Sequence, residues 1–109
     1  MFKELIMITV TGKNFKAEVE EAEGLVVLDF YAVWCAPCSM LAPLLEELEA
    51  EYPDVKFGRV DVDSERLLMR EFAVQSIPFI AFVKDNTFLD FSEGYVPKEK
   101  LAEMIERYK

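Results

Sequence analysis

The chain has 109 residues, of which 52% are apolar, and its 21 acidic and 12 basic residues give a net charge of −9. This length suits one hydrophobic core, so we expect a single domain over residues 1–109. The acidic charge, with no cluster of basic and aromatic residues, excludes nucleic acid as an expected partner. Histidine is absent, which excludes Ser/His and Cys/His nucleophile pairs and zinc sites built on histidine.

No apolar run approaches the roughly 20 residues that span a bilayer, so we expect no transmembrane helix and no membrane partner. The first ten residues contain the early acid Glu4 and are not followed by a small-residue cleavage site. They therefore do not resemble a signal peptide, and we expect a cytoplasmic location.

Strands and helices alternate along most of the predicted chain. Segments rich in β-branched and aromatic residues predict strands, and apolar residues three and four apart predict helices. In chain order these are strand 6–10, helix 15–22, strand 25–31, helix 41–52, strand 55–62, helix 67–72, strands 79–83 and 87–92, and helix 101–108.

This order predicts an α/β fold with a mixed sheet covered by helices, because the early crossovers make neighbouring strands parallel. The short link 84–86 predicts an antiparallel hairpin at the end of the sheet. Strand 25–31 lacks the alternation of a half-exposed strand, so we expect it to be central. We also expect Ser64 to cap the helix that follows it, and Pro97 to lie in the first turn of the last helix.

Both cysteines lie in the motif Trp34-Cys35-Ala36-Pro37-Cys38, directly after the predicted central strand and at the start of a helix. A thiolate at a helix N-terminus faces unpaired backbone N–H groups and the positive end of the helix dipole, which lowers its pKa toward neutrality. We therefore expect Cys35 to be the nucleophile. Two intervening residues bring the second sulfur within bonding reach, so Cys38 is expected to resolve a mixed disulfide.

Two other interpretations of the cysteine pair are less favourable. A structural disulfide that closes so small a loop constrains the unfolded chain little, and a cytoplasmic protein would not keep it oxidised. A zinc site would need a second pair of ligands, and the chain has neither more cysteines nor any histidine. We therefore expect no metal site within the chain.

From about Thr9 to Tyr108, the sequence resembles the thioredoxin family. Beyond the cysteine motif, the likeness rests on Asp29, Pro43, Asp61-Val62-Asp63, Ser76-Ile77-Pro78 and Gly94. It implies a thioredoxin fold, with a central five-stranded mixed β-sheet flanked by four α-helices. It also implies a monomeric protein-disulfide reductase without a cofactor that maintains cell redox homeostasis. Its expected partners are disulfide-containing protein substrates, with a thioredoxin reductase as electron donor.

Asp29 interrupts the apolar strand 25–31, where burial would disfavour its charged form and raise its pKa. An exposed aspartate at the strand end is the alternative. The family resemblance implies that Asp29 takes the proton from Cys38, and that Pro43 bends the helix that contains it.

The resemblance also implies which residues bind substrate. Pro78 would be cis and pack beside the cysteines, and the backbone of Ile77 would bond an extended substrate strand. Trp34 would flank the same surface, although an ordinary core tryptophan is the alternative. Ala36, Pro37 and Gly94 complete the expected binding set.

Several positions depart from the common family pattern: Ala36 stands where glycine is usual, Ser39 where a base is frequent, and Arg59 where a lysine often lies near the acid. Glu93 and Tyr95 flank Gly94 in place of small or apolar residues. They raise two alternatives, an oxidoreductase with one dedicated client and a binding module in which the thiols are incidental. We expect a reducing pair, nearer the about −270 mV of thioredoxin than the about −120 mV of a strong oxidant.

Overall fold

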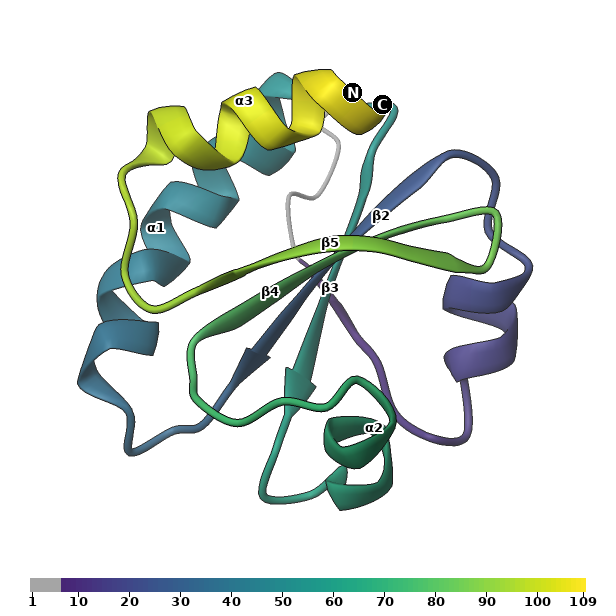
Figure 1. Cartoon of the computed structure of the whole chain (residues 1–109), viewed down its shortest axis with the longest axis vertical. Coiled ribbons are helices and arrows are strands. Elements are labelled where there is room, and N and C mark those ends of the chain that lie inside the picture. The colour runs from purple at the N-terminus through teal and green to yellow at the C-terminus, as the bar shows by residue number, and fades with distance from the viewer. Residues whose placement is uncertain (1–6) are drawn as a thin grey trace, which may run out of the picture.

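A computed structural model of the chain describes residues 7–109 (Figure 1). Residues 1–6 lie outside this description, among them the predicted strand residue Ile6 and the early acid Glu4. The elements are β1 Ile8–Thr9, η1 Lys16–Glu20, β2 Leu25–Tyr31, α1 Ala36–Glu51, β3 Lys56–Asp61, α2 Arg66–Glu71, β4 Phe79–Lys84, β5 Thr87–Glu93 and α3 Lys98–Tyr108.

The five strands form one mixed sheet, as predicted, and their order in it is β1-β3-β2-β4-β5. β3 runs parallel to both β1 and β2, whereas β4 is antiparallel to β2 and β5. The central strand β2 is buried along its whole length except at Tyr31. Its unbroken apolar sequence is therefore explained by cover on both faces.

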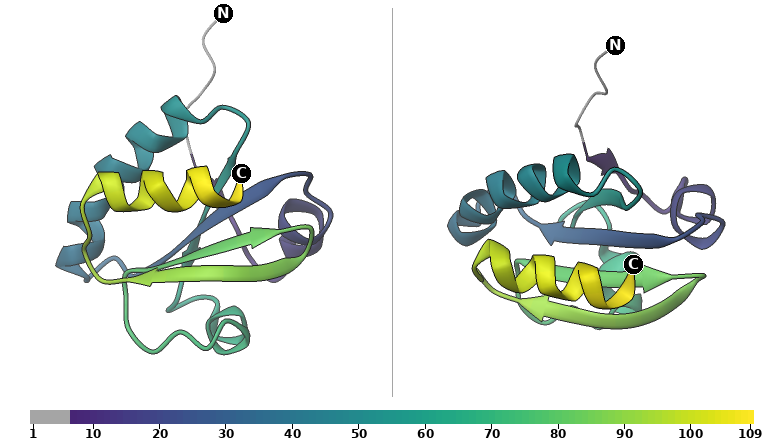
Figure 2. Two further views of the ribbon diagram at one scale, coloured as in Figure 1. Left: turned by 45° about the horizontal axis from the view of Figure 1, so that its top comes forward. Right: turned by 90° about the horizontal axis from the view of Figure 1, so that it is seen from above.

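Helices cover both faces of the sheet. Leu45 and Leu48 of α1 and Leu101 of α3 pack with Val27 of β2 on one face, and these two helices lie side by side (Figure 2). Val19 of η1 and residues of α2 pack against the other face. No helix within residues 7–109 is long and apolar enough to cross a membrane.

The predicted hairpin joins β4 to β5. Asp85 and Asn86 have φ angles of 53° and 59°, the left-handed conformation that a two-residue turn between twisted strands requires. Aspartate and asparagine tolerate this conformation better than most residues, so the hairpin forms without a glycine.

The ends of three helices differ from the sequence-based expectation. The first helical segment is a π-helix, in which Glu21 N donates to Lys16 O over 2.9 Å. Ser64 is not a cap, because its own N–H and that of Glu65 both donate to the carbonyl of Asp61 in a turn; α2 begins two residues later, at Arg66. Pro97 occupies the N-cap of α3 rather than its first turn, since its ψ of 150° is extended.

Candidate functional site

The two cysteines lie where the chain leaves β2 and enters α1, and a disulfide joins them. Cys35 is the N-cap residue of α1, with an extended backbone, and its Sγ accepts a hydrogen bond from Cys38 N over 3.3 Å. The sulfur thus occupies the position of a capping oxygen, beside N–H groups that have no partner within the helix. Both cysteines are buried. Their Cα atoms are 5.3 Å apart, a normal separation for a disulfide.

The residues between the cysteines favour this arrangement. Ala36 and Pro37 are the first two residues of α1. Proline has no N–H to lose, and its fixed φ is compatible with the first helical turn, so the motif starts the helix at the nucleophile itself. Pro43 lies further along inside α1, as predicted.

The Ile77–Pro78 peptide bond lies at the same end of the sheet as the cysteines. Phe30 of β2 pairs with Phe79 of β4. Pro78, the residue before Phe79, therefore lies level with the end of β2 from which the chain continues to Cys35. The peptide bond before Pro78 is cis, as the family resemblance implied. Gly94 N donates to Pro78 O over 2.8 Å, and the φ of 77° at Gly94 favours glycine.

Trp34 is 70% exposed, so the alternative of a core tryptophan is wrong. Its Nε1 donates to Oδ2 of Asp63 over 2.8 Å, which fixes the ring across the end of β3. In the sequence, Asp63 was recognised only as part of the family pattern, and no role was predicted for it. Its place just beyond a strand that ends beside β2 is the signal that would have linked it to Trp34.

Asp29 is only 2% exposed, so the alternative of an exposed strand-end aspartate is also wrong. It points to the face of β2 that α1 and α3 cover, beside Arg59 of β3 and Ile80 of β4. Neither carboxylate oxygen accepts a hydrogen bond from the described residues. Burial raises the pKa of Asp29 from 3.8 to about 7, although the positive charge of Arg59 opposes this shift.

Arg59 does not neutralise this carboxylate. Its Nε lies 3.8 Å from Asp29 Oδ2, beyond hydrogen-bond distance, and its guanidinium carbon lies 3.9 Å from the centre of the Tyr31 ring. Part of its charge is therefore directed to the ring and to solvent, and desolvation decides the sign of the Asp29 shift. The site thus contains a carboxyl group able to exchange protons near neutral pH.

Glu93 and Tyr95 lie on either side of Gly94, and both are exposed. The carboxylate of Glu93 accepts a hydrogen bond from the hydroxyl of Ser76. This contact joins the end of β5 to the segment before the cis peptide. Ser76 was noted in the sequence only as part of a motif, because a contact between residues 17 apart has no local signature.

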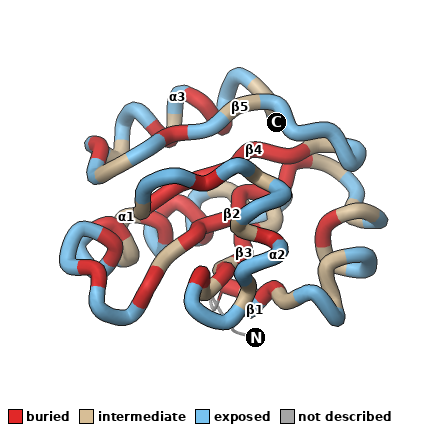
Figure 3. Tube along the Cα trace, turned by 60° about the horizontal axis from the view of Figure 1, so that its bottom comes forward, coloured by how far each residue is buried: buried red, intermediate tan, exposed pale blue. Residues whose placement is uncertain are grey.

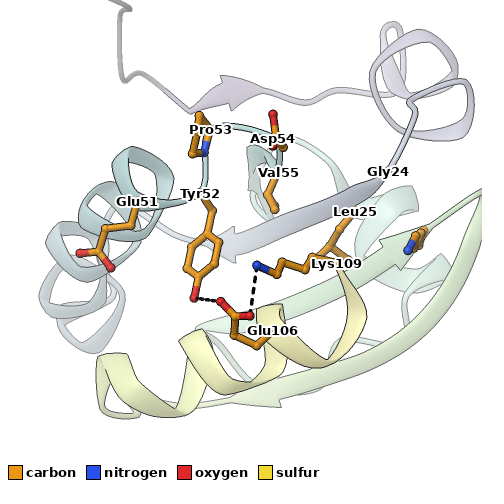
Figure 4. Close-up of a pocket in the computed structure, with 10 residues that line it drawn as sticks. Gly24, Leu25, Glu51, Tyr52, Pro53, Asp54, Val55, Glu106 and Lys109 are labelled. Atoms are coloured by element: carbon orange, nitrogen blue, oxygen red, sulfur yellow. Dashed lines mark hydrogen bonds and ion pairs between the residues drawn. The ribbon is translucent and has the colours of Figure 1, made fainter.

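A pocket of 230 Å³ lies on the Trp34 side of the site and is lined by Asp63, Gln75, Ser76 and Ile77 among others. A larger pocket of 780 Å³ lies at the opposite end of β2, around Gly24 and Leu25. There Tyr52 and Lys109 point toward Glu106 and bond its two carboxylate oxygens (Figure 4). The larger pocket holds neither cysteine, so pocket size does not locate the thiol chemistry.

The sheet, the cysteine pair that caps a helix and the cis-proline segment beside it together define a thiol–disulfide oxidoreductase. A family model described as Thioredoxin matches residues 6–107. The chain is 38% identical over 105 residues to the thioredoxin of Bacillus subtilis, covering 95% of this chain and 99% of that protein. It is 44% identical over 100 residues to the thioredoxin of Listeria monocytogenes, covering 91% and 95% of the two chains.

Among solved structures, that of Fasciola hepatica thioredoxin superposes with a TM-score of 0.88 at 36% identity. The match covers 94% of this chain and all of the other. The chain belongs to the thioredoxin family. It is a protein-disulfide reductase that works by dithiol–disulfide exchange through its Cys-x-x-Cys pair, and its substrates are proteins that contain disulfides.

Proposed function

We propose that Cys35 is the attacking thiolate of this reductase. It attacks one sulfur of a client disulfide, the client S–S bond breaks, and one client thiolate leaves. The mixed disulfide between Cys35 and the client carries the reaction forward. The observation that supports this order is the hydrogen bond from Cys38 N to Cys35 Sγ, because such donors stabilise negative charge on sulfur.

Cys38 then completes the exchange. Its thiolate attacks Cys35 Sγ, the mixed disulfide breaks, and the second client thiolate leaves as the protein disulfide forms. Two electrons pass from the protein dithiol to the client. Asp29 takes the proton that Cys38 must lose, a role favoured by a pKa of about 7. A thioredoxin reductase, by analogy with the family, returns two electrons to the pair.

The client would bind at the surface formed by Trp34, Ala36, Pro37, the Ile77–Pro78 peptide and Gly94. The N–H and carbonyl of Ile77 would bond an extended client strand, as in β-strand addition. We propose that the chain acts as one domain and as a monomer in the cytoplasm, without a bound cofactor and without nucleic acid or membrane partners.

Trapping of the mixed disulfide tests the order of attack. Cys38→Ser should accumulate a covalent adduct with a disulfide protein through Cys35, whereas Cys35→Ala should accumulate none. Non-reducing electrophoresis followed by mass spectrometry locates the bond. Equal trapping by both variants would contradict the assigned roles.

The role of Asp29 needs a kinetic test that separates the two chemical steps. In stopped-flow traces, Asp29→Asn should slow the resolution step more than the attack step, because only Cys38 depends on the carboxylate for deprotonation. If only the attack step slowed, Asp29 would not be the proton acceptor.

A further inference from the structure

Four phenylalanines form an aromatic patch at the edge of the sheet: Phe72, Phe79, Phe88 and Phe91, hereafter the β5 aromatic patch. Phe79 and Phe91 stack with ring centres 5.1 Å apart, and Phe88 lies 5.6 Å from Phe72. Phe88 and Phe91 remain 44% and 45% exposed. Two large adjacent rings left half in water are typical of a surface that a partner covers.

An irregular strand pairing creates this patch. Phe91 pairs with Ala81, but Val83 pairs with Phe88 and Phe82 with Asp90, so β5 contains one extra residue in this stretch. Side chains three apart on a regular strand point to opposite faces. The bulge brings Phe88 and Phe91 to the same face. In Figure 3, β5 is largely exposed beside the buried strand β4.

Two pockets on this patch continue toward the cysteine end of the sheet. The first, of 460 Å³, is lined by Phe15, Phe72 and Phe88 among others. The second, of 280 Å³, shares Phe72 and Phe88 with the first and extends to Gln75 and Glu93. Gln75 also lines the pocket beside Trp34. Adjacent pockets with shared walls therefore lead from the redox site to the aromatic patch.

Among the described residues, the two pockets are lined by acidic and not by basic side chains, whereas Arg66 lines the neighbouring pocket beside Trp34. The acidic side chains are those of Glu20, Glu71 and Glu93. A second copy of the chain would bring the same carboxylates and a further net charge of −9 to this surface. An apolar segment that carries positive charge is the complementary partner.

We propose that these pockets hold an extended, cationic and apolar segment of the client protein whose disulfide is reduced at Cys35. Aliphatic or aromatic client side chains would cover the β5 aromatic patch, and lysine or arginine side chains would lie near Glu20, Glu71 and Glu93. Phe88 lies five residues from Glu93 along β5, about 17 Å at the usual rise per residue. Because Glu93 lies at the cysteine end of β5, the client residues that contact Phe88 should lie at least about five positions from the client half-cystine. This inference rests on the proposed site of exchange and adds client specificity to it.

The probes for a test are synthetic peptides in which one cysteine is linked to nitrothiobenzoate, whose release is coloured. Three ten-residue peptides carry, beyond a common cysteine segment, a tail of phenylalanine and lysine, of phenylalanine and glutamate, or of serine and lysine. Each is made with the tail on either side of the cysteine, and cysteine–nitrothiobenzoate serves as the tail-less probe. The full-length protein is reduced beforehand, and the second-order rate constant is measured at two salt concentrations.

At low salt the apolar cationic tail should react about tenfold faster than the acidic tail, and added salt should narrow this difference. In wild type the phenylalanine–lysine tail should also react faster than the serine–lysine tail, and Phe88→Ser/Phe91→Ser should remove most of that difference. Each rate is expressed relative to the same variant's rate on the tail-less probe. Leu89→Ser is the matched control, because Leu89 is 38% exposed on the same strand but lines neither pocket. It should keep the full preference.

Glu20→Gln/Glu71→Gln provides a second variant that leaves the rings in place, so the test does not depend on the folding of the double serine protein. In this variant the ratio of the rate on the phenylalanine–lysine tail to that on the phenylalanine–glutamate tail should fall about threefold. The preference for phenylalanine over serine should remain. Equal rates for all tails, with normal reduction of the tail-less probe, would overturn the inference and leave the exchange mechanism intact. Failure to reduce the tail-less probe would instead contradict the mechanism. A dimer in sedimentation equilibrium that Phe88→Ser/Phe91→Ser dissolves would assign the patch to a second copy and overturn the client proposal.

Discussion

The carboxylates near the two ends of the central strand β2 have opposite environments, and their pKa values are shifted in opposite directions. Near the end at Tyr31, Asp29 is buried without a hydrogen bond from the described residues, and its pKa rises to about 7. Near the end at Leu25, Glu106 is exposed, and hydrogen bonds from Tyr52 and Lys109 lower its pKa. The first carboxylate is desolvated and poorly paired, whereas the second is solvated and paired.

This difference distinguishes the end of the molecule that carries the thiol chemistry from the end whose charged groups are only structural. A buried carboxyl that accepts no hydrogen bond within residues 7–109 and is only loosely paired with Arg59 destabilises the fold, so its presence next to the cysteine helix indicates a chemical use. The larger pocket lies at the other end, where hydrogen bonds from Tyr52 and Lys109 lower the pKa of the exposed Glu106.

The largest expected effect is loss of the cysteine pair. Cys35→Ser/Cys38→Ser should abolish reduction of a disulfide protein, because no sulfur remains to form the mixed disulfide. Tyr52→Phe at the opposite end should keep the wild-type rate. Rates are measured with a chemical reductant that regenerates the dithiol. Undiminished biological activity of the double serine protein would favour the binding-module alternative.

The second prediction concerns the pH dependence of stability. The folded pKa of Asp29, about 7, exceeds the ordinary 3.8, so between these values the folded protein holds a proton that the unfolded chain has released. Its contribution to the free energy of unfolding is fully present below about pH 4 and is lost as the pH rises through 7. Asp29→Asn removes this loss. Its stability relative to wild type should therefore grow by about 3 kcal/mol between pH 5 and pH 8.

Urea unfolding of the oxidised proteins at several pH values measures this difference. Asp29→Ala is a useful second variant, since its packing defect lowers the stability at every pH but leaves the same flattened pH profile. A wild-type pH profile that persists in both variants would show that the carboxylate is not desolvated as the structure indicates.

The sequence predicted much of this end of the molecule because its signals are local. The unbroken apolar run of β2 indicated a central strand, and the cysteines at a strand-to-helix junction indicated the thiol site. The burial of Asp29 followed from its apolar neighbours in the chain. By contrast, the turn that displaces Ser64 from its expected capping role depends on Asp61 accepting two N–H groups, which composition does not reveal.

Contacts between distant strands were also beyond prediction. A Cβ at Gly58 would lie 2.8 Å from Cγ2 of Val10 and 3.1 Å from Cδ2 of Leu28, so glycine is needed there only because β1 and β2 approach β3. The bulge that aligns Phe88 with Phe91 likewise depends on the register against β4. A glycine inside a strand indicates a close approach, but the sequence near Gly58, Phe88 or Phe91 does not show which distant residues approach it, since that depends on the register of the strands.

Two glycines allow a matched comparison of the two ends. Gly94 at the cysteine end and Gly24 at the other end both have a φ of 77°, and neither would place a Cβ closer than 4.0 Å to the atoms around it. Alanine at either position should therefore destabilise the protein by a similar amount, about 1–2 kcal/mol, through backbone strain alone. Only Gly94→Ala should also raise the KM for a disulfide protein, because Gly94 lies in the proposed client surface.

Thermal unfolding of the two variants measures the loss of stability, and steady-state kinetics measures the KM for a disulfide protein. Equal KM values would remove Gly94 from the client surface. A larger loss of stability at one glycine would mean that contacts, and not only φ, distinguish the two positions.

The smallest effect is expected for Glu106→Gln in the larger pocket. The pKa of Glu106 is lowered, first by the hydrogen bond from Tyr52, so its contribution to stability is present at neutral pH and is lost as the pH falls through the folded value. Full exposure to solvent screens the contribution, and the urea midpoints of variant and wild type should nearly coincide at neutral pH and converge further in acid. The rate of disulfide reduction should not change. A substitution with no role in the chemistry should not lower the rate by more than about twofold. A larger fall would mean that the end of β2 farther from the cysteines takes part in the reaction, and the division of the molecule into two ends would then be wrong.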